Sequence, residues 1–326
     1  MEPLGIGLVG LGRWGRNYVR TLSGLAECRL VAVADSDPAV LAAAAIPSGV
    51  TRCESTARLL SDPAVEAVVI ATPDTTHYSL SSAALRAGRD ALVEKPMTLR
   101  VVEAETVVRQ AEDAKRILAV GHTAIYSMDM ESLRVRLDAL PRHAERKVVA
   151  ERTSSGPSPR PRPHPPLSGS ASRIGRASAI LFDLCPHDIA IGLLLFGTPA
   201  AVRARGSERS VEYEVRFESG ELLAGRAEWR EPPSVRRFQV ANTDDPGHEN
   251  ASPVSRAVRD TPLGLQCLDF IRCCQTRRQP LSNGQLGLAV VRCLAALDSS
   301  CSDSGTWVQV NAEFPTSHNE RLGVRT

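Results

Sequence analysis

The stretch Gly7-Leu-Val-Gly-Leu-Gly-Arg-Trp-Gly15 decides the fold that we expect for this chain. Its apolar beginning predicts a short buried strand, and the residues from Arg16 to Leu25 predict a helix. Between them, Gly10, Gly12 and Gly15 have the spacing G-x-G-x-x-G. Because this spacing lies between a strand and a helix, it predicts a dinucleotide-binding loop. A glycine-rich structural turn is the alternative.

Each glycine of this loop has a physical role. Gly10 allows the tight turn, Gly12 lets a pyrophosphate approach the backbone, and Gly15 lets the helix pack closely on the strand. The free N–H groups and the dipole at the start of the helix favour the phosphate charge. We therefore expect Arg13 and Trp14, which lie between these glycines, to contact the cofactor as well.

The composition is that of an ordinary globular protein. The chain has 326 residues, enough for about two domains. The formal net charge of +2 is too small to indicate binding to nucleic acid or to an anionic membrane. The longest apolar stretch, Ile189 to Phe196, is too short to span a bilayer, and no basic-plus-apolar leader precedes the first strand. We expect a cytoplasmic protein.

The cysteines do not predict a metal site. None of them forms a C-x-x-C pair, and nothing has the spacing of zinc ligands. We expect reduced, mostly buried thiols. The eight cysteines are Cys28, Cys53, Cys185, Cys267, Cys273, Cys274, Cys293 and Cys301.

An acidic residue follows the second predicted strand, Cys28 to Ala34. Asp35 lies twenty residues beyond Gly15, where a carboxylate can accept hydrogen bonds from the ribose hydroxyls of an adenosine. Since a carboxylate repels a 2′-phosphate, Asp35 favours NAD over NADP, although the adjacent Ser36 is compatible with some use of NADP. Alternatively, Asp35 caps the helix that follows Asp37.

Strands and helices then alternate as far as residue 122. This pattern predicts a doubly wound parallel sheet, and we assign residues 1–122 to an NAD-binding Rossmann domain. The expected strands are 50–53, 67–71, 91–93 and 117–120, and the expected helices are 55–61, 78–87 and 101–114. Ligands bind at the carboxyl ends of such strands, where we expect Thr72, Pro73, His77, Glu94 and Lys95 to contact the cofactor.

The pattern changes after residue 122. We assign residues 123–326 to a substrate-binding and oligomerisation α+β domain with a mostly antiparallel open sheet of four to six strands. The strand-like region runs from Ala200 to Asn242, and one helix with Pro186 inside it is expected over residues 177–196. The proline-rich segment from Gly156 to Pro166 is either a disordered linker or a loop that folds over the site.

Two clusters can carry acid–base chemistry. Lys95 lies at the end of a predicted strand on the ligand side, and Glu94 can orient its ammonium group. A lysine beside a bound nicotinamide acts as an acid or base if its pKa falls; an ordinary surface ion pair is the alternative.

Asp183 and His187 are four residues apart and share a helix face, so Asp183 can hold His187 or a substrate hydroxyl, and His187 can exchange a proton. A helix cap plus a structural histidine is the alternative.

These motifs together resemble the Gfo/Idh/MocA family, named after glucose–fructose oxidoreductase and inositol dehydrogenase. The glycine loop, Ala71-Thr-Pro, Glu94-Lys-Pro and Asp183-x-x-x-His187 occur in that order at those spacings. Three further stretches are similar to the family branch that contains UDP-N-acetylglucosaminuronate 3-dehydrogenases. They are Gly12-Arg-Trp-Gly-Arg-Asn17, Val120-Gly-His-Thr123 with Tyr126, and Cys185-Pro-His-Asp-Ile189. Residues 262–310 also look like that branch.

The resemblance implies NAD(P) and oxidation or reduction of a sugar, nucleotide-sugar or cyclitol carbon, with Lys95, Asp183 and His187 as the catalytic residues. It also implies a homodimer or homotetramer. We expect Tyr126, Arg152 and Arg176 to contact the substrate, although solvated charge is an equal alternative for the arginines. The alternatives for the function are an NAD-cycling epimerase or glycosidase-type enzyme without net redox change, and a non-catalytic NAD-binding sensor.

One departure from the family bears on the substrate. Family members usually have glycines just before the Asp-x-x-x-His helix, whereas Ile174-Gly-Arg-Ala-Ser-Ala-Ile180 has a single glycine. The proline-rich segment from Gly156 to Pro166 is also unusual, and it falls where family members contact substrate. Both features concern the substrate pocket and not the hydride chemistry.

Overall fold

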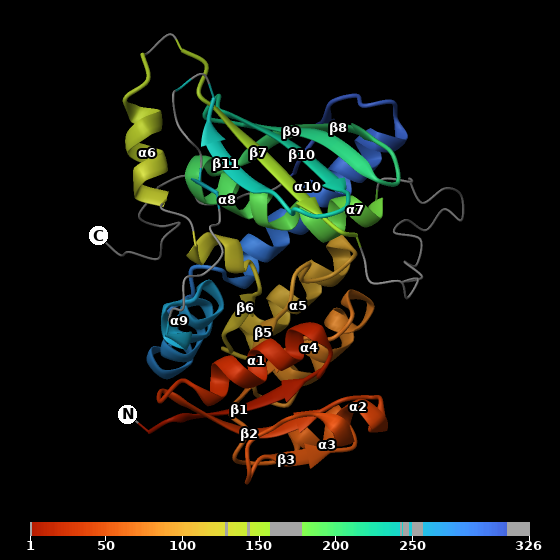
Figure 1. Ribbon diagram of the computed structural model, residues 1–326, viewed down its shortest axis with the longest axis vertical. Helices are drawn as coiled ribbons and strands as arrows, with labels where there is room; N and C mark the ends of the chain where they lie inside the picture. Colours follow the sequence, from red (N-terminus) through yellow and green to blue (C-terminus); the bar gives the residue numbers. More distant parts are fainter. Residues whose placement is uncertain are drawn as a thin grey trace. The chain divides into compact units, whose positions relative to one another are not determined.

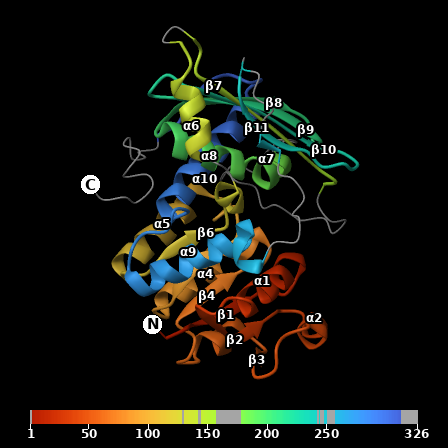
Figure 2. The same ribbon diagram turned by 60° about the vertical axis from the view of Figure 1, so that its left-hand side comes forward.

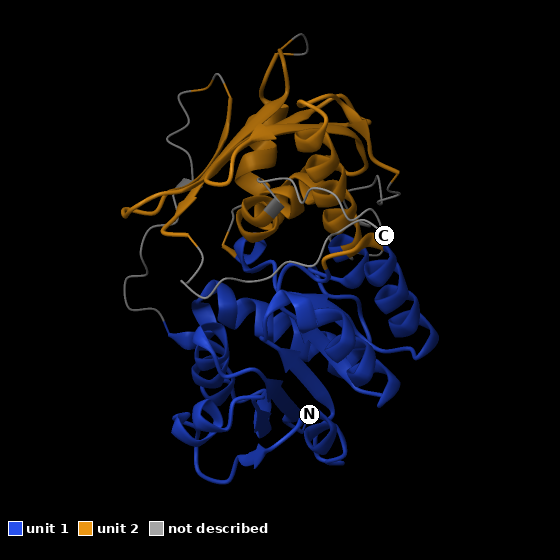
Figure 3. Cartoon of the chain, turned by 90° about the vertical axis from the view of Figure 1, so that its right-hand side faces the viewer, with its two compact units in different colours: residues 1–98, 102–126, 253–287 blue, residues 99–101, 127–252, 288–326 orange. Residues whose placement is uncertain are grey.

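The computed structural model describes residues 2–127, 130–141, 144–156, 178–241, 243, 248–249 and 257–311. The chain forms two compact units, each assembled from separate stretches of sequence (Figure 3). The first unit comprises residues 1–98, 102–126 and 253–287, and the second comprises residues 99–101, 127–252 and 288–326. Each unit is described by itself.

The first unit is built on a six-stranded sheet with the order β3-β2-β1-β4-β5-β6, in which every strand pair is parallel. Its strands are β1 (Leu4–Val9), β2 (Cys28–Ala34), β3 (Thr51–Cys53), β4 (Ala67–Ile70), β5 (Asp90–Val93) and β6 (Leu118–Val120). Its helices are α1 (Arg13–Ser23), α2 (Pro38–Ala43), α3 (Thr56–Leu60), η1 (Asp74–Thr76), α4 (His77–Arg86), α5 (Val101–Asp113), η2 (Thr123–Tyr126), η3 (Val258–Asp260) and α9 (Pro262–Thr276).

The strands of this sheet are apolar and covered. Every residue of β1 and β4 is buried, as expected for parallel strands that carry helices on both faces. The expected doubly wound parallel sheet is therefore confirmed. Helix α1 packs on β1 and α4 on β4, and all four elements are labelled in Figure 2.

Helix α1 begins earlier than the sequence suggested. It starts at Arg13 and not at Arg16, and Gly12 occupies the N-cap position with extended backbone angles. Gly15 thus lies inside the first turn of the helix, where we had expected a turn before the helix. A glycine inside a helix costs about 1 kcal/mol relative to alanine, so the glycine spacing argued against a helix at this point. The helix nevertheless includes Gly15, because the carbonyl of Gly10 packs so closely against it that no side chain fits there.

Helix α9 packs on α1, although more than two hundred residues separate them in the sequence. Its Cys267, Phe270 and Ile271 belong to the same buried cluster as Ile6 and Tyr18. The compact first unit therefore includes residues 253–287. The division into a cofactor domain (residues 1–122) and a substrate domain (residues 123–326) remains a prediction. The compact units differ from it, because the first unit also contains residues 253–287.

The second unit is built on a seven-stranded sheet with the order β12-β11-β7-β10-β9-β8-β13. All its pairs are antiparallel except β10 with β7. The strands are β7 (Lys147–Ser154), β8 (Pro199–Gly206), β9 (Ser210–Phe217), β10 (Leu222–Trp229), β11 (Arg236–Val240), β12 (His248–Glu249) and β13 (Val308–Gln309). The helices are α6 (Met130–Asp138), α7 (Ser178–Leu184), α8 (Pro186–Phe196) and α10 (Gly284–Ser302), of which α10 begins in the first unit.

Helices cover one face of this sheet. Figures 1 and 2 show α7 and α8 along the same face. Burial alternates along β9, so that Val211, Tyr213, Val215 and Phe217 point into the core. The expected mostly antiparallel open sheet is confirmed, with one parallel strand pair. It has seven strands instead of the four to six expected, and two of them, β12 and β13, are only two residues long.

The single helix expected over residues 177–196 is wrong. The structure has α7 and α8, separated at Cys185. Pro186 causes the break, because it has no N–H group and its ring crowds the carbonyl four residues earlier. Cys185 keeps right-handed helical angles (φ −77°, ψ −19°), so the turn from Asp183 to His187 is nevertheless preserved.

Within the part of the chain that the structure describes, no helix combines the length and apolar composition needed to cross a membrane.

Candidate cofactor and catalytic site

The glycine loop has the shape that a phosphate cradle requires. Gly10 has φ +94°, and a Cβ on it would lie 2.5 Å from the carbonyl oxygen of Ala71. A Cβ on Gly15 would lie 2.0 Å from the carbonyl oxygen of Gly10, so only glycine fits either position. A Cβ on Gly12, by contrast, would meet nothing within 4 Å, and no side chain caps the start of α1. The open space and the N–H groups beside Gly12 fit a pyrophosphate.

Gly12→Ala and Gly15→Ala form a matched pair of substitutions that tests this cradle. We expect Gly12→Ala to keep the unfolding temperature of the unchanged protein, because its methyl group enters empty space. It should weaken NAD⁺ binding about ten- to hundredfold, because that space is where the pyrophosphate fits. Gly15→Ala should lower both the unfolding temperature and NAD⁺ affinity. Calorimetric titration and thermal unfolding measure these effects, and unchanged NAD⁺ affinity in Gly12→Ala would contradict the cradle.

Asp35 is held by the backbone on both carboxylate oxygens. Its Oδ2 accepts the N–H of Leu11 at 2.7 Å, and its Oδ1 accepts the N–H of Asp37 at 2.9 Å. The cap of α2 is Asp37, which accepts from Ala39 at 2.9 Å and from Val40 at 3.4 Å. The alternative that Asp35 caps this helix is therefore wrong. Asp35 instead joins the carboxyl end of β2 to the glycine loop, which is where a ribose-binding carboxylate is expected.

The other residues predicted on this edge differ in exposure. Arg13 and Ser36 are exposed, and Trp14 has an exposed fraction of 43%, which is unusual for a large apolar side chain in the part of the chain described. Pro73 is also exposed, and Thr72 is half-buried. Their exposure leaves room for a ligand, and their contact with the cofactor stays a prediction.

His77 is almost completely buried. Its Nδ1 lies 2.7 Å from the carbonyl oxygen of Pro96, and its Nε2 lies 2.9 Å from that of Thr72. Burial lowers the pKa of His77, while the two backbone contacts act in the opposite direction. The ring therefore connects the segments that follow β4 and β5. This placement gives His77 an indirect role in shaping the cofactor edge and does not support the expected direct contact.

Glu94 lies buried beside Lys95. Its Oε1 accepts the hydroxyl of Tyr18 at 2.7 Å, and its Oε2 accepts the backbone N–H of Lys95 at 3.2 Å. Burial raises the pKa of Glu94, and the Tyr18 hydrogen bond and the Lys95 charge lower it. Gly121 lies flat against this carboxyl group, since a Cβ there would lie 3.0 Å from its atoms. With Glu94 only 7% exposed, the alternative of an ordinary surface ion pair does not describe these two residues.

Two buried polar residues behind Glu94 were missed by sequence reasoning. The hydroxyl of Tyr18 accepts the side-chain amide N–H of Gln266 at 3.0 Å, and the amide oxygen of Gln266 accepts the hydroxyl of Thr123 at 3.0 Å. Tyr18 lies on α1 and Gln266 on α9, and both are at most 1% exposed. The one signal in the sequence is the polar Gln266 inside the apolar stretch Leu263-Gly-Leu-Gln-Cys-Leu268.

The turn after β6 holds two further polar residues. The hydroxyl of Tyr126 donates to Oδ2 of Asp269 at 2.6 Å, which fastens η2 to α9. Burial raises the pKa of Tyr126 well above its usual value. Tyr126 thus has a structural partner, and its predicted substrate contact gains no support. Burial also lowers the pKa of His122 to about 3, so this ring is neutral; its Nδ1 contacts the hydroxyl of Ser282 at 3.1 Å.

In the second unit, Asp183 and His187 are both half-buried. Among the residues from Ile180 to Pro199, these two alone are not classed as buried. The indole N–H of Trp229 donates to Oδ2 of Asp183 at 3.3 Å. Cys185 lies between them in sequence and is buried, and burial raises the pKa of its thiol well above the usual value, so it is not a nucleophile. The four-residue spacing therefore brings an acid and a histidine to one side of the turn between α7 and α8, where both are half-buried.

Arg152 does not lie on that surface. It is 7% exposed and forms a bidentate ion pair with Asp188, which is 2% exposed. The hydroxyl of Tyr213 donates to the same carboxylate at 3.2 Å. A buried, paired guanidinium is not available as the expected substrate contact, so we correct that prediction. Arg176, and the segment from Gly156 to Pro166 apart from Gly156 itself, lie outside the described residues.

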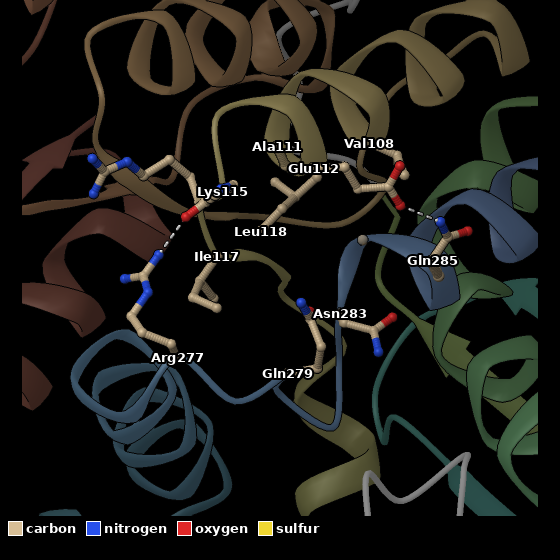
Figure 4. Close-up of a pocket in the computed structure, with 12 residues that line it drawn as sticks. Val108, Ala111, Glu112, Lys115, Ile117, Leu118, Arg277, Gln279, Asn283 and Gln285 are labelled. Carbon is tan, nitrogen blue, oxygen red and sulfur yellow. Dashed lines mark hydrogen bonds between the residues drawn. The ribbon is translucent and has the colours of Figure 1, made fainter.

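A pocket in the first unit lies away from the cofactor edge (Figure 4). Its lining includes Lys115, Leu118, Arg277, Asn283 and Gln285, and Gln285 donates to Glu112 at 2.8 Å. These residues surround the beginning of β6, whereas ligands of parallel sheets bind at the carboxyl ends of the strands. The pocket is therefore separate from the glycine loop and from Lys95.

Residues 4–122 match the model of the family described as oxidoreductase family, NAD-binding Rossmann fold (GFO_IDH_MocA). The chain is 34% identical over 201 residues to inositol 2-dehydrogenase of Rhizobium meliloti and 30% identical over 204 residues to UDP-N-acetylglucosamine 3-dehydrogenase of Acidithiobacillus ferrooxidans. In both cases the match covers 61% of this chain and 57% of the relative.

The fold likeness extends over nearly the whole chain. The crystal structure of GenD2 from gentamicin A biosynthesis, in complex with NAD, superimposes with a TM-score of 0.79 at 21% identity and covers 96% of this chain and 97% of that one. The likeness therefore shows the fold, which combines a parallel sheet carrying a glycine loop with a second, mostly antiparallel sheet. Residues 4–122 of the chain are therefore similar to the NAD-binding Rossmann fold of the Gfo/Idh/MocA oxidoreductase family.

Proposed function

We propose that this protein is an NAD-dependent dehydrogenase or ketoreductase that acts on a secondary alcohol or ketone of a sugar, nucleotide sugar or cyclitol. The observation that carries the proposal is the buried Glu94 beside Lys95 at the carboxyl end of β5, on the same sheet edge as the open cradle at Gly12. The matched relatives act on inositol and on UDP-N-acetylglucosamine, which supports this substrate class.

The residues divide the work as follows. The cofactor supplies the hydride acceptor. We assign to Lys95 the removal of the hydroxyl proton in the oxidation direction, through its side-chain Nζ. Asp183 binds the substrate hydroxyl or orients His187, and His187 exchanges the substrate proton. Glu94 accepts the Lys95 backbone N–H, so that it fixes the point from which this side chain extends. Such fixed positions contribute to rate because the reacting groups need no further ordering.

Asp35 should set the preference for NAD over NADP. We expect Asp35→Ser to raise the KM for NAD⁺ about tenfold or more, because the ribose hydroxyls lose a charged acceptor, and to lower the KM for NADP⁺, because the repulsion of a 2′-phosphate is removed. Steady-state kinetics with both cofactors measures the change. Asp37→Ser is the matched control, since it alters the neighbouring cap of α2. A wild-type preference for NADP⁺ would contradict the role of Asp35.

The proposed activity is tested by a screen of the purified protein. The protein is incubated with NAD⁺ or NADP⁺ and with sugars, nucleotide sugars and inositols, and formation of reduced nicotinamide is followed by absorbance. We expect reduced cofactor with at least one member of the panel. Product formed without reduced cofactor would favour the NAD-cycling alternative. Binding of NAD⁺ with no product from any compound would favour the sensor.

We also place the protein in the cytoplasm as a homodimer or homotetramer. All eight cysteines are free, and seven are buried, which fits a reducing compartment and agrees with the thiols expected from the sequence. The oligomer is an expectation of the family resemblance. Light scattering of the purified chain gives its mass in solution.

A further inference from the structure

We propose that Tyr18, held by Gln266, is a positioning residue for Lys95 that acts through the carboxylate of Glu94. The inference rests on the proposed function, because it explains how the surroundings of Lys95 are kept fixed. Its physical content can nevertheless be measured without a substrate.

The hydrogen bonds run in one direction through the interior of the first unit. The hydroxyl of Thr123 donates to Gln266, the amide of Gln266 donates to Tyr18, and the hydroxyl of Tyr18 donates to Oε1 of Glu94. The other oxygen of Glu94 accepts the backbone N–H of Lys95. Because Gln266 donates to the Tyr18 oxygen, the single proton of the Tyr18 hydroxyl is directed to Glu94. The chain therefore orients one group at each step.

Burial makes this arrangement selective. Tyr18, Gln266 and Glu94 are 0%, 1% and 7% exposed, so water does not easily replace a missing partner. A buried carboxylate is costly unless it is hydrogen-bonded or paired with a charge. Tyr18 supplies a hydrogen bond from one side, and Lys95 supplies a hydrogen bond and a charge from the other. Loss of the Tyr18 hydroxyl thus favours protonation of Glu94, and a protonated carboxyl group holds the Lys95 backbone less well.

The titratable groups around Glu94 come from several elements. Tyr18 approaches from α1, Cys267 from α9, and Lys95 from the adjacent position; His122, in the turn after β6, lies within the influence of the Lys95 charge. Burial lowers the pKa of His122 to about 3 and raises the pKa of Cys267, whereas the pKa of Glu94 is raised above its usual value, so His122 titrates below Glu94 and Cys267 above it. His77 is the other buried group that can affect the Lys95 amide, because its Nδ1 lies 2.7 Å from the Pro96 carbonyl oxygen and burial lowers its pKa. Tyr18→Phe distinguishes the two groups, since the Tyr18 hydroxyl donates to Glu94.

The sequence offers a direct probe, because the chain has only three lysines: Lys95, Lys115 and Lys147. Protein labelled with ¹⁵N-lysine gives three backbone amide signals in an NMR spectrum, and Lys115→Arg and Lys147→Arg identify the signal of Lys95. We expect the Lys95 amide shift to titrate with the ionisation of its acceptor, Glu94. In Tyr18→Phe, which keeps the buried ring, the midpoint should move to higher pH.

Two variants serve as controls for this titration. Tyr78→Phe makes the same chemical change on α4 and should leave the midpoint unchanged, because the described hydrogen bonds of Glu94 come from Tyr18 and from the Lys95 backbone. Gln266→Leu keeps the Tyr18 hydroxyl but removes its anchor, so its midpoint should fall between those of wild type and Tyr18→Phe. The proposal is overturned if the Lys95 amide does not titrate. It is also overturned if Tyr18→Phe, like the control Tyr78→Phe, keeps the wild-type midpoint.

Kinetics supplies a second readout. With myo-inositol, or the panel compound that is oxidised fastest, kcat of Tyr18→Phe should fall about tenfold at neutral pH, its acid limb should move to higher pH, and KM for NAD⁺ should stay unchanged. An unchanged kcat profile together with a wild-type amide titration overturns the positioning role while the proposed function stands. If no panel compound reacts, the amide titration still decides between positioning and a merely structural hydroxyl.

Discussion

Lys95→Met lowers kcat by about 10²- to 10⁴-fold in the oxidation of the best panel substrate, because the variant has no group to take the hydroxyl proton. Methionine keeps the length and the apolar stem of lysine, and the backbone N–H that Glu94 accepts is retained. The fold should therefore persist, which a circular-dichroism spectrum checks. Stopped-flow or steady-state measurement of reduced nicotinamide gives kcat.

Lys115→Met is the matched control for this experiment. Lys115 is exposed and lies in the pocket of Figure 4, at the opposite end of the strands from Lys95. Its substitution should leave kcat within twofold of wild type. A Lys95→Met variant that reacts as fast as the control would remove Lys95 from the mechanism.

The second large effect concerns the stability of the second unit. Arg152→Ala should lower the free energy of unfolding by about 3–5 kcal/mol, because it leaves the carboxylate of Asp188 buried without its partner. Urea denaturation followed by circular dichroism measures the change. Arg152→Met combined with Asp188→Leu should recover much of the loss, since an apolar pair of similar volume carries no buried charge.

Arg226→Ala provides the comparison for the buried pair. Arg226 lies on β10 and pairs with Glu228 at 3.5 Å, with side-chain exposed fractions of 58% and 30%. An exposed pair contributes about 0–1 kcal/mol, so this variant should unfold almost like wild type. Equal effects of the two substitutions would show that the Arg152–Asp188 pair contributes nothing special to the fold.

The first unit was predictable because its signals are local. Each buried strand is marked by a short apolar run, as at β1, β2 and β4. The three glycines of the loop likewise lie within six residues, at positions 10, 12 and 15. The start of α1 was misplaced because helix propensity argues against glycine, whereas the carbonyl of Gly10 leaves room for nothing larger at Gly15. The sequence left open whether Asp35 binds a ribose or caps α2, and the structure shows Asp37 as the cap, because the Asp37 side chain accepts the N–H groups of Ala39 and Val40.

Within the candidate site, the sequence could point only to residues that belong to a short local motif. Lys95, Asp183 and His187 could be selected from their spacing and their places on predicted elements. The partner of Arg152 could not, because Asp188 reaches it from a different element 36 residues away. The hydrogen bond between Tyr18 and Gln266 joins residues 248 positions apart, and local patterns hold no information on such pairs. The same limit applies to Tyr126, whose partner Asp269 lies on α9.

Transfer of deuterium from the substrate to the cofactor is the decisive observation for hydride transfer at this site. The protein is incubated with NAD⁺ and with carbon-deuterated myo-inositol, or with the correspondingly labelled panel substrate, and the reduced cofactor and the product are examined by mass spectrometry. We expect one deuterium in the reduced nicotinamide, because the carbinol hydride passes to the cofactor. Deuterium returned to the product would identify the NAD-cycling alternative. Deuterium lost to solvent, with none in the cofactor or the product, would contradict hydride transfer at this site.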